Sequence, residues 1–253
     1  FAVCTNEGNA DLGTSFPDLH IAIMGLEKVV PDYRSLAVFT RLLARSATGQ
    51  PVTAYTSLYR RPEPGKQIHV VIVDNGRTES LRNEAHRNML KCLRCGACMN
   101  SCPVYRHITG HGYGSIYPGP MGIVLTPLLV GYKETAKLPY ACSLCGSCAD
   151  VCPVKIPLPD LIAQHRRNIV SLGYVSPAEK AAFSAAAATF SNRTLYGIAT
   201  TVAPSIMKAL TGNTNQIDKS TTFIPVLNGW TASRNLDPMN KEKFRTWFAH
   251  HKQ

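Results

Sequence analysis

Hydrophobic residues in the first third of the chain occur in short runs separated by turns, which is the pattern of β-strands. Four such runs predict strands at residues 1–4, 20–24, 52–58 and 68–73. Between the second and third runs, residues 32–47 carry an apolar face at helical spacing and end at Gly49-Gln50-Pro51. Residues 1–90 therefore predict an α/β region with four strands in a sheet.

The rest of the chain has helical patterns. Residues 123–130 form an apolar run after a Pro118-Gly119-Pro120 turn, and residues 171–253 begin with the capping box Ser176-Pro177-Ala178-Glu179. Asp237-Pro238 predicts the start of a last helix, whose aromatic stripe is expected in the core: Phe244, Trp247 and Phe248. Residues 157–172 predict a helix with one buried side, formed by Leu158, Leu161, Ile162, His165 and Ile169.

Few predicted helices accompany the strands, so we expect their sheet to expose an edge or an apolar face. The chain begins at Phe1, without an initiator Met or a secretory signal, and we interpret it as part of a longer or processed protein that would cover this face. Charged residues are 17% of the 253 residues, below the typical ~25%, which indicates a surface buried against something else. No apolar run reaches the ~18 residues of a membrane helix.

Eight of the nine cysteines fall into two copies of one motif. The first copy is Cys92-x2-Cys95-x2-Cys98-x3-Cys102-Pro103, and the second lies 50 residues later: Cys142-x2-Cys145-x2-Cys148-x3-Cys152-Pro153. This is the spacing of two-cluster ferredoxins, whose cysteines bind two [4Fe-4S] clusters. Gly96 and Gly146 follow the second cysteine of each copy and would let the backbone pass close to a cluster.

The fourth cysteine of each copy is expected to bind the other cluster, as in two-cluster ferredoxins. The proline that follows it also turns the chain away from its own loop. The sequence therefore predicts two clusters with crossed ligands. Cluster one takes Cys92, Cys95, Cys98 and Cys152, and cluster two takes Cys142, Cys145, Cys148 and Cys102.

Two other uses of cysteine fit this pattern less well. Zinc sites pair cysteines across a longer spacer and use four ligands in all, and disulfide frameworks belong to small secreted domains. The ninth cysteine, Cys4, lies in the first apolar run and is expected to be a small buried side chain.

The formal net charge of +11 is unevenly spread, with +1 in residues 1–90, +5 in residues 91–170 and +5 in residues 171–253. A basic excess raises the alternative of a nucleic-acid-binding protein with a structural metal. Because a cluster bound by four thiolates is anionic, we instead expect basic residues beside the motifs to offset its charge. These residues are Lys91, Arg94, Arg106, Lys155, Arg166 and Arg167.

Further motifs accompany the cysteines: Thr5-Asn6-Glu7-Gly8-Asn9, residues 20–28 and 44–50, Asp74-Asn75-Gly76-Arg77, His111-Gly112-Tyr113-Gly114 and Tyr117-Pro118-Gly119-Pro120. With them, nearly the whole chain resembles the lactate-utilization iron–sulfur protein B family. The resemblance implies an α+β protein in three parts. Residues 1–90 would be the C-terminal part of an α/β lactate-utilization (LUD) domain, related to CoA-transferase-like folds. Residues 91–170 would be an α-helical ferredoxin module with two [4Fe-4S] clusters, and residues 171–253 a helical extension.

The resemblance also implies a role as the electron-transfer component of a cytoplasmic complex that oxidises L-lactate to pyruvate. Its partners would be other lactate-utilization subunits and an electron acceptor, with peripheral attachment to the inner face of the membrane as the alternative location. The alternative function is the iron–sulfur subunit of another dehydrogenase, acting on glycerol phosphate or glycolate. No Gly-rich dinucleotide loop follows the strands, so no hydride chemistry is assigned to this chain.

Two loops are candidates for chemistry beyond electron transfer. Glu7 and Asn9 follow the first strand, where α/β sheets place ligands, and would line a small-acid or cofactor site. The alternative for them is a turn stabilised by Asn side chains. His107 and His111 follow Cys102 but lack a third metal ligand. They are expected to pack near the clusters, with a hydrogen bond to a cluster sulfur as the alternative.

Overall fold

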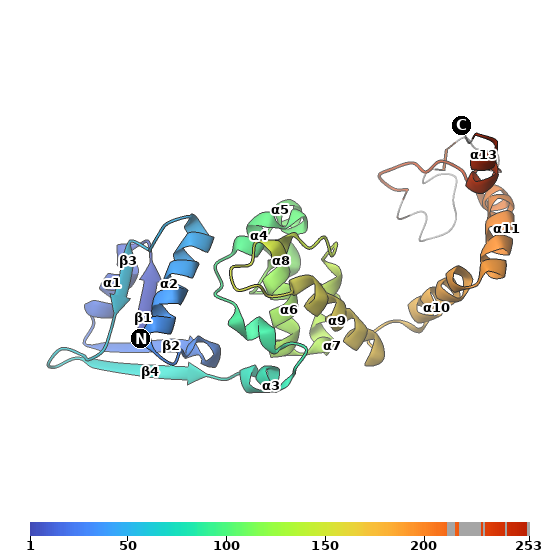
Figure 1. Ribbon diagram of the computed structural model, residues 1–253. Coiled ribbons are helices and arrows are strands. Elements are labelled where there is room, and N and C mark those ends of the chain that lie inside the picture. The colour runs from blue at the N-terminus through green and yellow to red at the C-terminus, as the bar shows by residue number, and fades with distance from the viewer. Residues whose placement is uncertain (212–215, 218–228, 230, 241, 252–253) are drawn as a thin grey trace. The chain divides into compact units, whose positions relative to one another are not determined.

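The computed structural model describes residues 1–211, 216–217, 229, 231–240 and 242–251. The chain divides into two units, Phe1–Tyr174 and Val175–Gln253. The first unit contains the strands and a series of helices, and the described part of the second unit contains further helices (Figure 1). Among the described residues, no helix is long and apolar enough to cross a membrane.

The four strands form two separate pairs (Figure 1). β1 (Ala2–Thr5) is antiparallel to β3 (Tyr55–Leu58), and β2 (Leu19–Gly25) is parallel to β4 (Gln67–Val73), with Leu19 opposite Gln67. The predicted strands are confirmed, but their placement in one sheet is wrong, because hydrophobic runs do not specify which distant strands pair. β3 also begins three residues later than predicted, since the preceding Ala54 NH donates to the Asn6 side chain, 3.0 Å away.

Helices connect these strands along the chain. α1 (Gly8–Ser15) follows β1, and α2 (Tyr33–Thr48) confirms the predicted amphipathic helix. The Asp32 side chain caps α2 by accepting from the Ser35 NH at 2.7 Å, and Gly49 ends it in a left-handed conformation with φ of 77°. A short 3-10 turn, η1 (Leu26–Lys28), follows β2. The helix α3 (Arg77–Arg82) and the 3-10 turn η2 (Arg87–Lys91) come after β4 and precede the first cysteine motif.

The expected exposed apolar face is present on β2 and β4. Alternate residues of β2 point to one side, and on that strand Leu19, Ile21 and Ile23 are exposed, Ile23 by 73%. On β4, Val70, Val71 and Ile72 are also exposed. The described chain therefore leaves much of this strand pair uncovered.

The cysteine region is a helical module built around α6 (Gly119–Val130), which is buried from Gly119 to Pro127. Such a helix, apolar on all sides, needs neighbours all round. Its neighbours include α4 (Ala97–Ser101), α7 (Tyr132–Thr135) and α9 (Leu158–Ser171). The other elements are α5 (Pro103–Ile108), η3 (His111–Tyr113), η4 (Leu138–Tyr140) and α8 (Ser147–Asp150). Gly122 has no room for a side chain, because a Cβ there would lie 1.6 Å from the Tyr117 carbonyl oxygen.

The buried side of α9 is the predicted one: Leu158, Leu161, Ile162, His165 and Ile169. The His165 ring bonds the Val124 carbonyl through Nε2 at 3.0 Å and the Tyr132 hydroxyl through Nδ1 at 2.7 Å. It also stacks on the buried His86 ring, with 4.3 Å between centroids. Neither ring nitrogen of His86 has a hydrogen-bond partner in the described part of the chain.

The described part of the second unit includes the helices α10 (Pro177–Ser191), α11 (Arg193–Thr211) and α13 (Phe244–His250). The Ser176 hydroxyl caps α10 by accepting from the Glu179 NH at 3.1 Å, as predicted. The last helix begins at Phe244, not at Asp237 as predicted. Before it, the Asn240 side chain accepts a hydrogen bond from the Glu242 NH.

The aromatic stripe of α13 does not lie in a core, which corrects the prediction. Phe244, Trp247 and Phe248 are all exposed, Phe244 by 70%. Their rings stack on one another, since the Phe244 ring lies 5.8 Å from that of Trp247 and 5.6 Å from that of Phe248.

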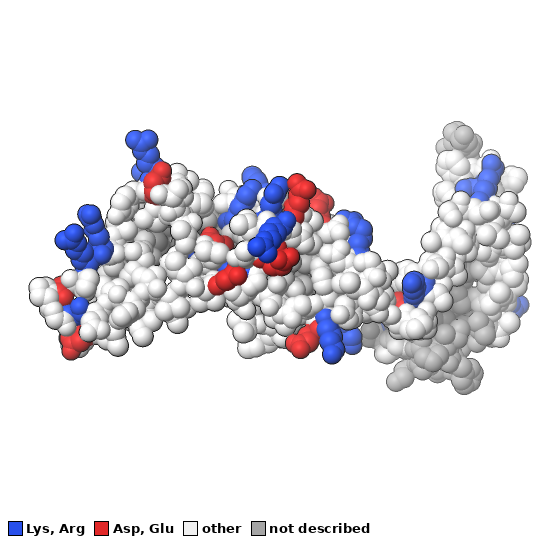
Figure 2. Space-filling model, turned by 90° about the horizontal axis from the view of Figure 1, so that it is seen from below, with Lys and Arg blue, Asp and Glu red and all other residues white. Residues whose placement is uncertain are grey.

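Basic and acidic side chains are interspersed on the face of Phe1–Tyr174 that Figure 2 shows, and no single continuous basic stripe is seen there. A duplex or single strand of nucleic acid is bound through such a stripe or groove of Lys and Arg. This face therefore gives no support to the nucleic-acid alternative.

Stability should decrease in mild acid because of the buried His165. Burial, and then the neighbouring His86, lower the pKa of His165 from 6.5 to about 4. Between these two pKa values the unfolded chain binds more protons than the folded chain. The contribution of neutral His165 to stability is therefore fully present above pH 6.5 and is lost as the pH falls toward 4. We expect the free energy of unfolding to fall by up to about 1.4 kcal/mol per pH unit below pH 6.5, measured by anaerobic urea unfolding from pH 7.5 to 5.5.

A matched pair of variants isolates this effect. His165→Gln should reduce the pH dependence, whereas His107→Gln, at an exposed histidine, should keep it. An unchanged slope in His165→Gln would show that another group controls the acid sensitivity.

Candidate metal centre

The two cysteine motifs have the same backbone geometry. Arg94 and Leu144, at equivalent positions, have φ of 59° and 57°, and Gly96 and Gly146 have φ of 81° and 87°. Positive φ is uncommon for residues other than glycine, so a shared positive value at Arg94 and Leu144 indicates one specialised loop used twice. Each loop leads directly into a short helix, α4 or α8, which carries the third cysteine of its motif.

The first and fourth cysteines of each motif accept a hydrogen bond from a backbone NH. Such NH···S bonds stabilise the thiolate form of a cysteine over the neutral thiol. The donors and acceptors are Arg94 to Cys92 and Leu144 to Cys142, both at 3.3 Å, and Tyr105 to Cys102 and Ile156 to Cys152, both at 3.4 Å.

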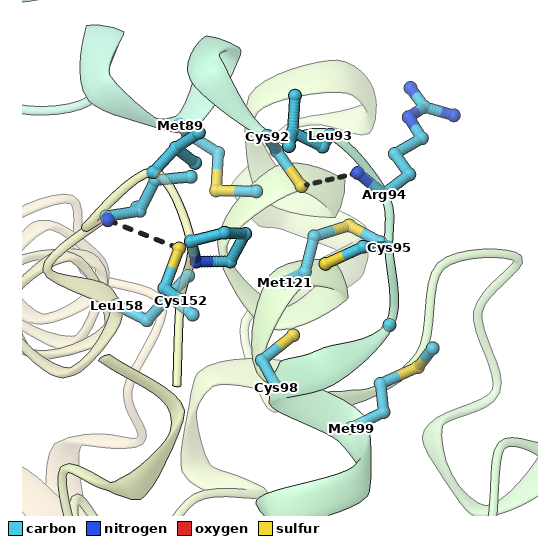
Figure 3. A pocket seen from close by; sticks show the side chains of 14 residues that line it. Met89, Cys92, Leu93, Arg94, Cys95, Cys98, Met99, Met121, Cys152 and Leu158 are labelled. Carbon is cyan, nitrogen blue, oxygen red and sulfur yellow. Dashed lines mark hydrogen bonds between the residues drawn. The ribbon is translucent and has the colours of Figure 1, made fainter. Parts of the chain in front are cut away.

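One pocket brings together cysteines from both motifs (Figure 3). Its lining includes Cys92, Cys95 and Cys98 of the first motif and Cys152 of the second. Figure 3 shows the Cys152 sulfur facing the other three across the pocket. The remaining lining is largely apolar and comes from Met89, Leu93, Met99, Met121, Pro153, Val154, Ile156 and Leu158.

The cysteines of the second motif have Cys102 of the first as a neighbour. Burial is the main cause that raises the pKa of Cys142, and the nearby Cys102 and Cys145 raise it further. Burial likewise raises the pKa of Cys148 to about 11, again with contributions from Cys142, Cys145 and Cys102. In the first pocket, the pKa of Cys92 is raised by burial and also by Cys152. The group formed by the first three cysteines of each motif therefore has the fourth cysteine of the other motif among its neighbours.

This arrangement fits an iron–sulfur cluster. Burial raises the pKa of Cys98 to about 12, so the free Cys98 thiol would be neutral, and a bound metal is what makes such a cysteine a thiolate. The soft sulfur donors, the largely apolar lining and the NH···S bonds are the environment in which Fe–S clusters are held. Cys92, Cys95, Cys98 and Cys152 would hold the group in the pocket of Figure 3.

A basic side chain donates a hydrogen bond to the backbone carbonyl of the first cysteine of each motif. Lys28 donates to the Cys92 carbonyl, and Arg166 donates to the Cys142 carbonyl at 2.6 Å. Of the six basic residues expected beside the clusters, Arg94 and Arg166 are half-buried against the motifs, while the other four are exposed: Lys91, Arg106, Lys155 and Arg167. Lys28 was not predicted to lie here, because it is 64 residues from Cys92 in the sequence, although residues 20–28 belong to the family motifs.

Glu27 connects residues 1–90, the LUD-like region, to the first cysteine loop. Its carboxylate, 6% exposed, accepts from Arg77 through one oxygen and from Arg94 through the other, the latter at 3.2 Å. Arg94 also donates to the Tyr117 hydroxyl at 2.7 Å and lies over the Tyr117 ring, 4.5 Å from its centroid. Two segments far apart in sequence thus hold the Arg94 side chain in place.

The other candidate residues lie apart from this pocket. Glu7 and Asn9 are exposed, and the Asn9 side chain donates to Glu7 at 3.1 Å. His107 bonds the Pro103 carbonyl at 2.7 Å, and His111 lies at the surface beside Tyr105 and Gly110. Cys4 is half-buried, less than predicted, because its strand β1 pairs on one side only, with β3.

Three comparisons with protein families match successive parts of the chain. Residues 1–79 match the LUD domain, residues 88–156 match the 4Fe-4S dicluster domain, and residues 164–253 match the C-terminal region of lactate utilisation protein B. The cysteine module therefore defines an iron–sulfur protein of the 4Fe-4S dicluster class, in a chain of the α+β class.

Known sequences identify the family. Lactate utilization protein B from Bacillus cytotoxicus is 46% identical over 255 residues, which cover 98% of this chain and 53% of that protein. Relatives from Bacillus mycoides and Bacillus cereus match to the same extent. The chain belongs to the lactate utilization protein B family and spans about half the length of the curated relatives it matches. No solved structure matches it significantly.

Loss of the Glu27 charge should destabilise the first unit. Glu27→Gln would leave Arg77, which is also buried, without its anion, and removing one partner of a buried ion pair costs roughly 3 kcal/mol. We expect anaerobic urea unfolding, followed by circular dichroism, to show this loss. Glu79→Gln is the control, because the Glu79–Arg82 pair is exposed and is worth at most about 1 kcal/mol. Equal effects of the two variants would contradict a stabilising role for the Glu27 network.

Proposed function

We propose that the chain is the iron–sulfur electron-transfer component of a complex that oxidises L-lactate to pyruvate. The observation that carries the proposal is the pocket that Cys152 shares with Cys92, Cys95 and Cys98. Such a set of four cysteines in an apolar lining suits a one-electron carrier. The relatives are named lactate utilization proteins, which favours lactate over glycerol phosphate or glycolate as the substrate of the complex.

The chain would hold two [4Fe-4S] clusters with crossed ligands. Cluster one would take Cys92, Cys95, Cys98 and Cys152, and cluster two would take Cys142, Cys145, Cys148 and Cys102. The shared pocket supports the first set, and the influence of Cys102 on the pKa of Cys142 and Cys148 supports the second. Crossing would also keep the two clusters near each other, as transfer of single electrons between them requires.

Oxidation of L-lactate to pyruvate releases two electrons and two protons, and bound clusters would supply one-electron carriers for this chemistry. The residues of this chain would hold and tune those carriers. Met89, Met121 and Leu158 exclude water from the first site, and the NH···S bonds favour the thiolate ligands. Other lactate-utilization subunits would take part in lactate oxidation, and an electron acceptor would remove the electrons. The exposed pair Glu7 and Asn9 is our candidate for a small-acid or cofactor loop.

Lactate should reduce the clusters through the partner subunits. The chain would be purified anaerobically together with those subunits, and its broad visible absorption followed after L-lactate is added. We expect bleaching with L-lactate but much less with glycolate or glycerol 3-phosphate. If dithionite bleaches the intact complex and L-lactate does not, the proposed substrate is wrong.

Serine variants should reveal which cysteines share a cluster. Under crossed ligation, Cys102→Ser and Cys145→Ser damage the same cluster, so both variants keep the electron paramagnetic resonance (EPR) spectrum of cluster one. Cys95→Ser and Cys152→Ser damage cluster one, so both keep the EPR spectrum of cluster two. Each variant should lose up to about half of the iron, and Cys4→Ser, outside both motifs, should lose none. Local ligation predicts the opposite grouping, in which Cys102→Ser resembles Cys95→Ser, and that result would refute the crossed assignment.

A further inference from the structure

The Tyr113 side chain is a buried polar group that the ligand assignment leaves unexplained. Tyr113 is 7% exposed, and its hydroxyl has no hydrogen-bond partner in the described part of the chain. Buried hydroxyl groups are nearly always hydrogen-bonded, because leaving one unpaired is costly. The unpaired hydroxyl therefore points to an acceptor that is present only when a metal group is bound, either a cysteine thiolate or an atom of that group.

The surroundings of Tyr113 identify that group. Burial raises the pKa of the Tyr113 hydroxyl well above its usual value, and the side chains of Cys102 and Cys142 raise it further. These two cysteines belong to different motifs, and both are assigned to cluster two. Tyr105, whose ring lies 6.1 Å from that of Tyr113, donates its backbone NH to the Cys102 sulfur. The phenol thus belongs to the surroundings of the second cluster.

We propose that the Tyr113 hydroxyl donates a hydrogen bond to the Cys102 thiolate or to an adjacent sulfide of cluster two, and thereby raises the reduction potential of that cluster relative to cluster one. The proposal rests on the crossed ligation described above. Reduction adds negative charge to a cluster, so a hydrogen-bond donor stabilises the reduced state more than the oxidised state. Tyr113 would have the role that the sequence analysis considered for His107 and His111.

Among the described residues, the first cluster site has no equivalent group. Its pocket is lined by thioether and aliphatic side chains such as Met89, Met121 and Leu158, and no hydroxyl side chain is among its lining residues. The polar side chain there, Arg94, directs its guanidinium to Glu27 and Tyr117 instead. A side-chain hydrogen bond to sulfur would therefore distinguish the two clusters.

The variant Tyr113→Phe tests this role, because it keeps the ring and removes only the hydroxyl. The protein would be loaded with both clusters and titrated with dithionite under EPR, without lactate or partner subunits. We expect the equilibrium constant for moving an electron from cluster one to cluster two to fall about tenfold, as for loss of one hydrogen bond to a charged group. The control Tyr105→Phe keeps the backbone donor to Cys102 and should change neither potential.

Two further measurements distinguish an effect of the Tyr113 hydroxyl on the reduction potential from a purely structural role. Electron–nuclear double resonance should show an exchangeable proton coupled to cluster two that disappears in Tyr113→Phe. If that variant does not load, 3-fluorotyrosine at position 113, a more acidic donor, should raise the potential of cluster two. Unchanged potentials in fully loaded Tyr113→Phe, or a shift confined to cluster one, would overturn the proposal. Because no lactate is used, such a failure would leave the proposed substrate untouched.

Discussion

Sulfur atoms in an apolar core need compensating charge and hydrogen-bond donors, and this requirement organises the cysteine module. Cys102, Cys148 and Cys152 are buried and Cys98 is half-buried, and Cys98, Cys148 and Cys152 pack with aliphatic and thioether side chains. A thiolate is tolerated there only with metal, NH donors or cations around it. The chain supplies the last two through four NH···S bonds and through Lys28 and Arg166 on the loop carbonyls. Iron would supply the rest, so that loading of the clusters and folding of the module are coupled.

The same requirement ties the LUD-like region to the first cysteine loop. Lys28 follows Glu27 in the turn η1, so one short segment provides both a cation at Cys92 and the carboxylate that holds Arg94. The second motif has Leu144 at the position of Arg94, and its cation, Arg166, comes from α9 within the module. The two loops have the same backbone conformation but differ in their charged surroundings. In the proposed assignment, described charged groups of residues 1–90 would therefore lie beside cluster one, and Arg166 of the module would lie beside cluster two.

Local features of this fold could be predicted from the sequence because neighbouring residues decide them. Gly49 ends α2, Ser176 caps α10, and equal cysteine spacing gives equal loops. Features that depend on distant contacts could not be predicted, such as the pairing of β2 with β4. Nearness in sequence was a poor guide to cations, since Lys91 and Lys155 are exposed while Lys28 reaches Cys92. Tyr113 carried no signal of burial, because it stands among glycines and polar residues.

We propose that two clusters exchange their fourth ligands and so join the two motifs of the module. A crystal structure of the anaerobically purified protein, with data collected at the iron absorption edge, would test this exchange. Crossed ligation predicts two groups of iron atoms, with the Cys152 sulfur bonded to the group of Cys92, Cys95 and Cys98, and the Cys102 sulfur bonded to the other group. Iron groups bound by the four cysteines of a single motif, or zinc in their place, would contradict it.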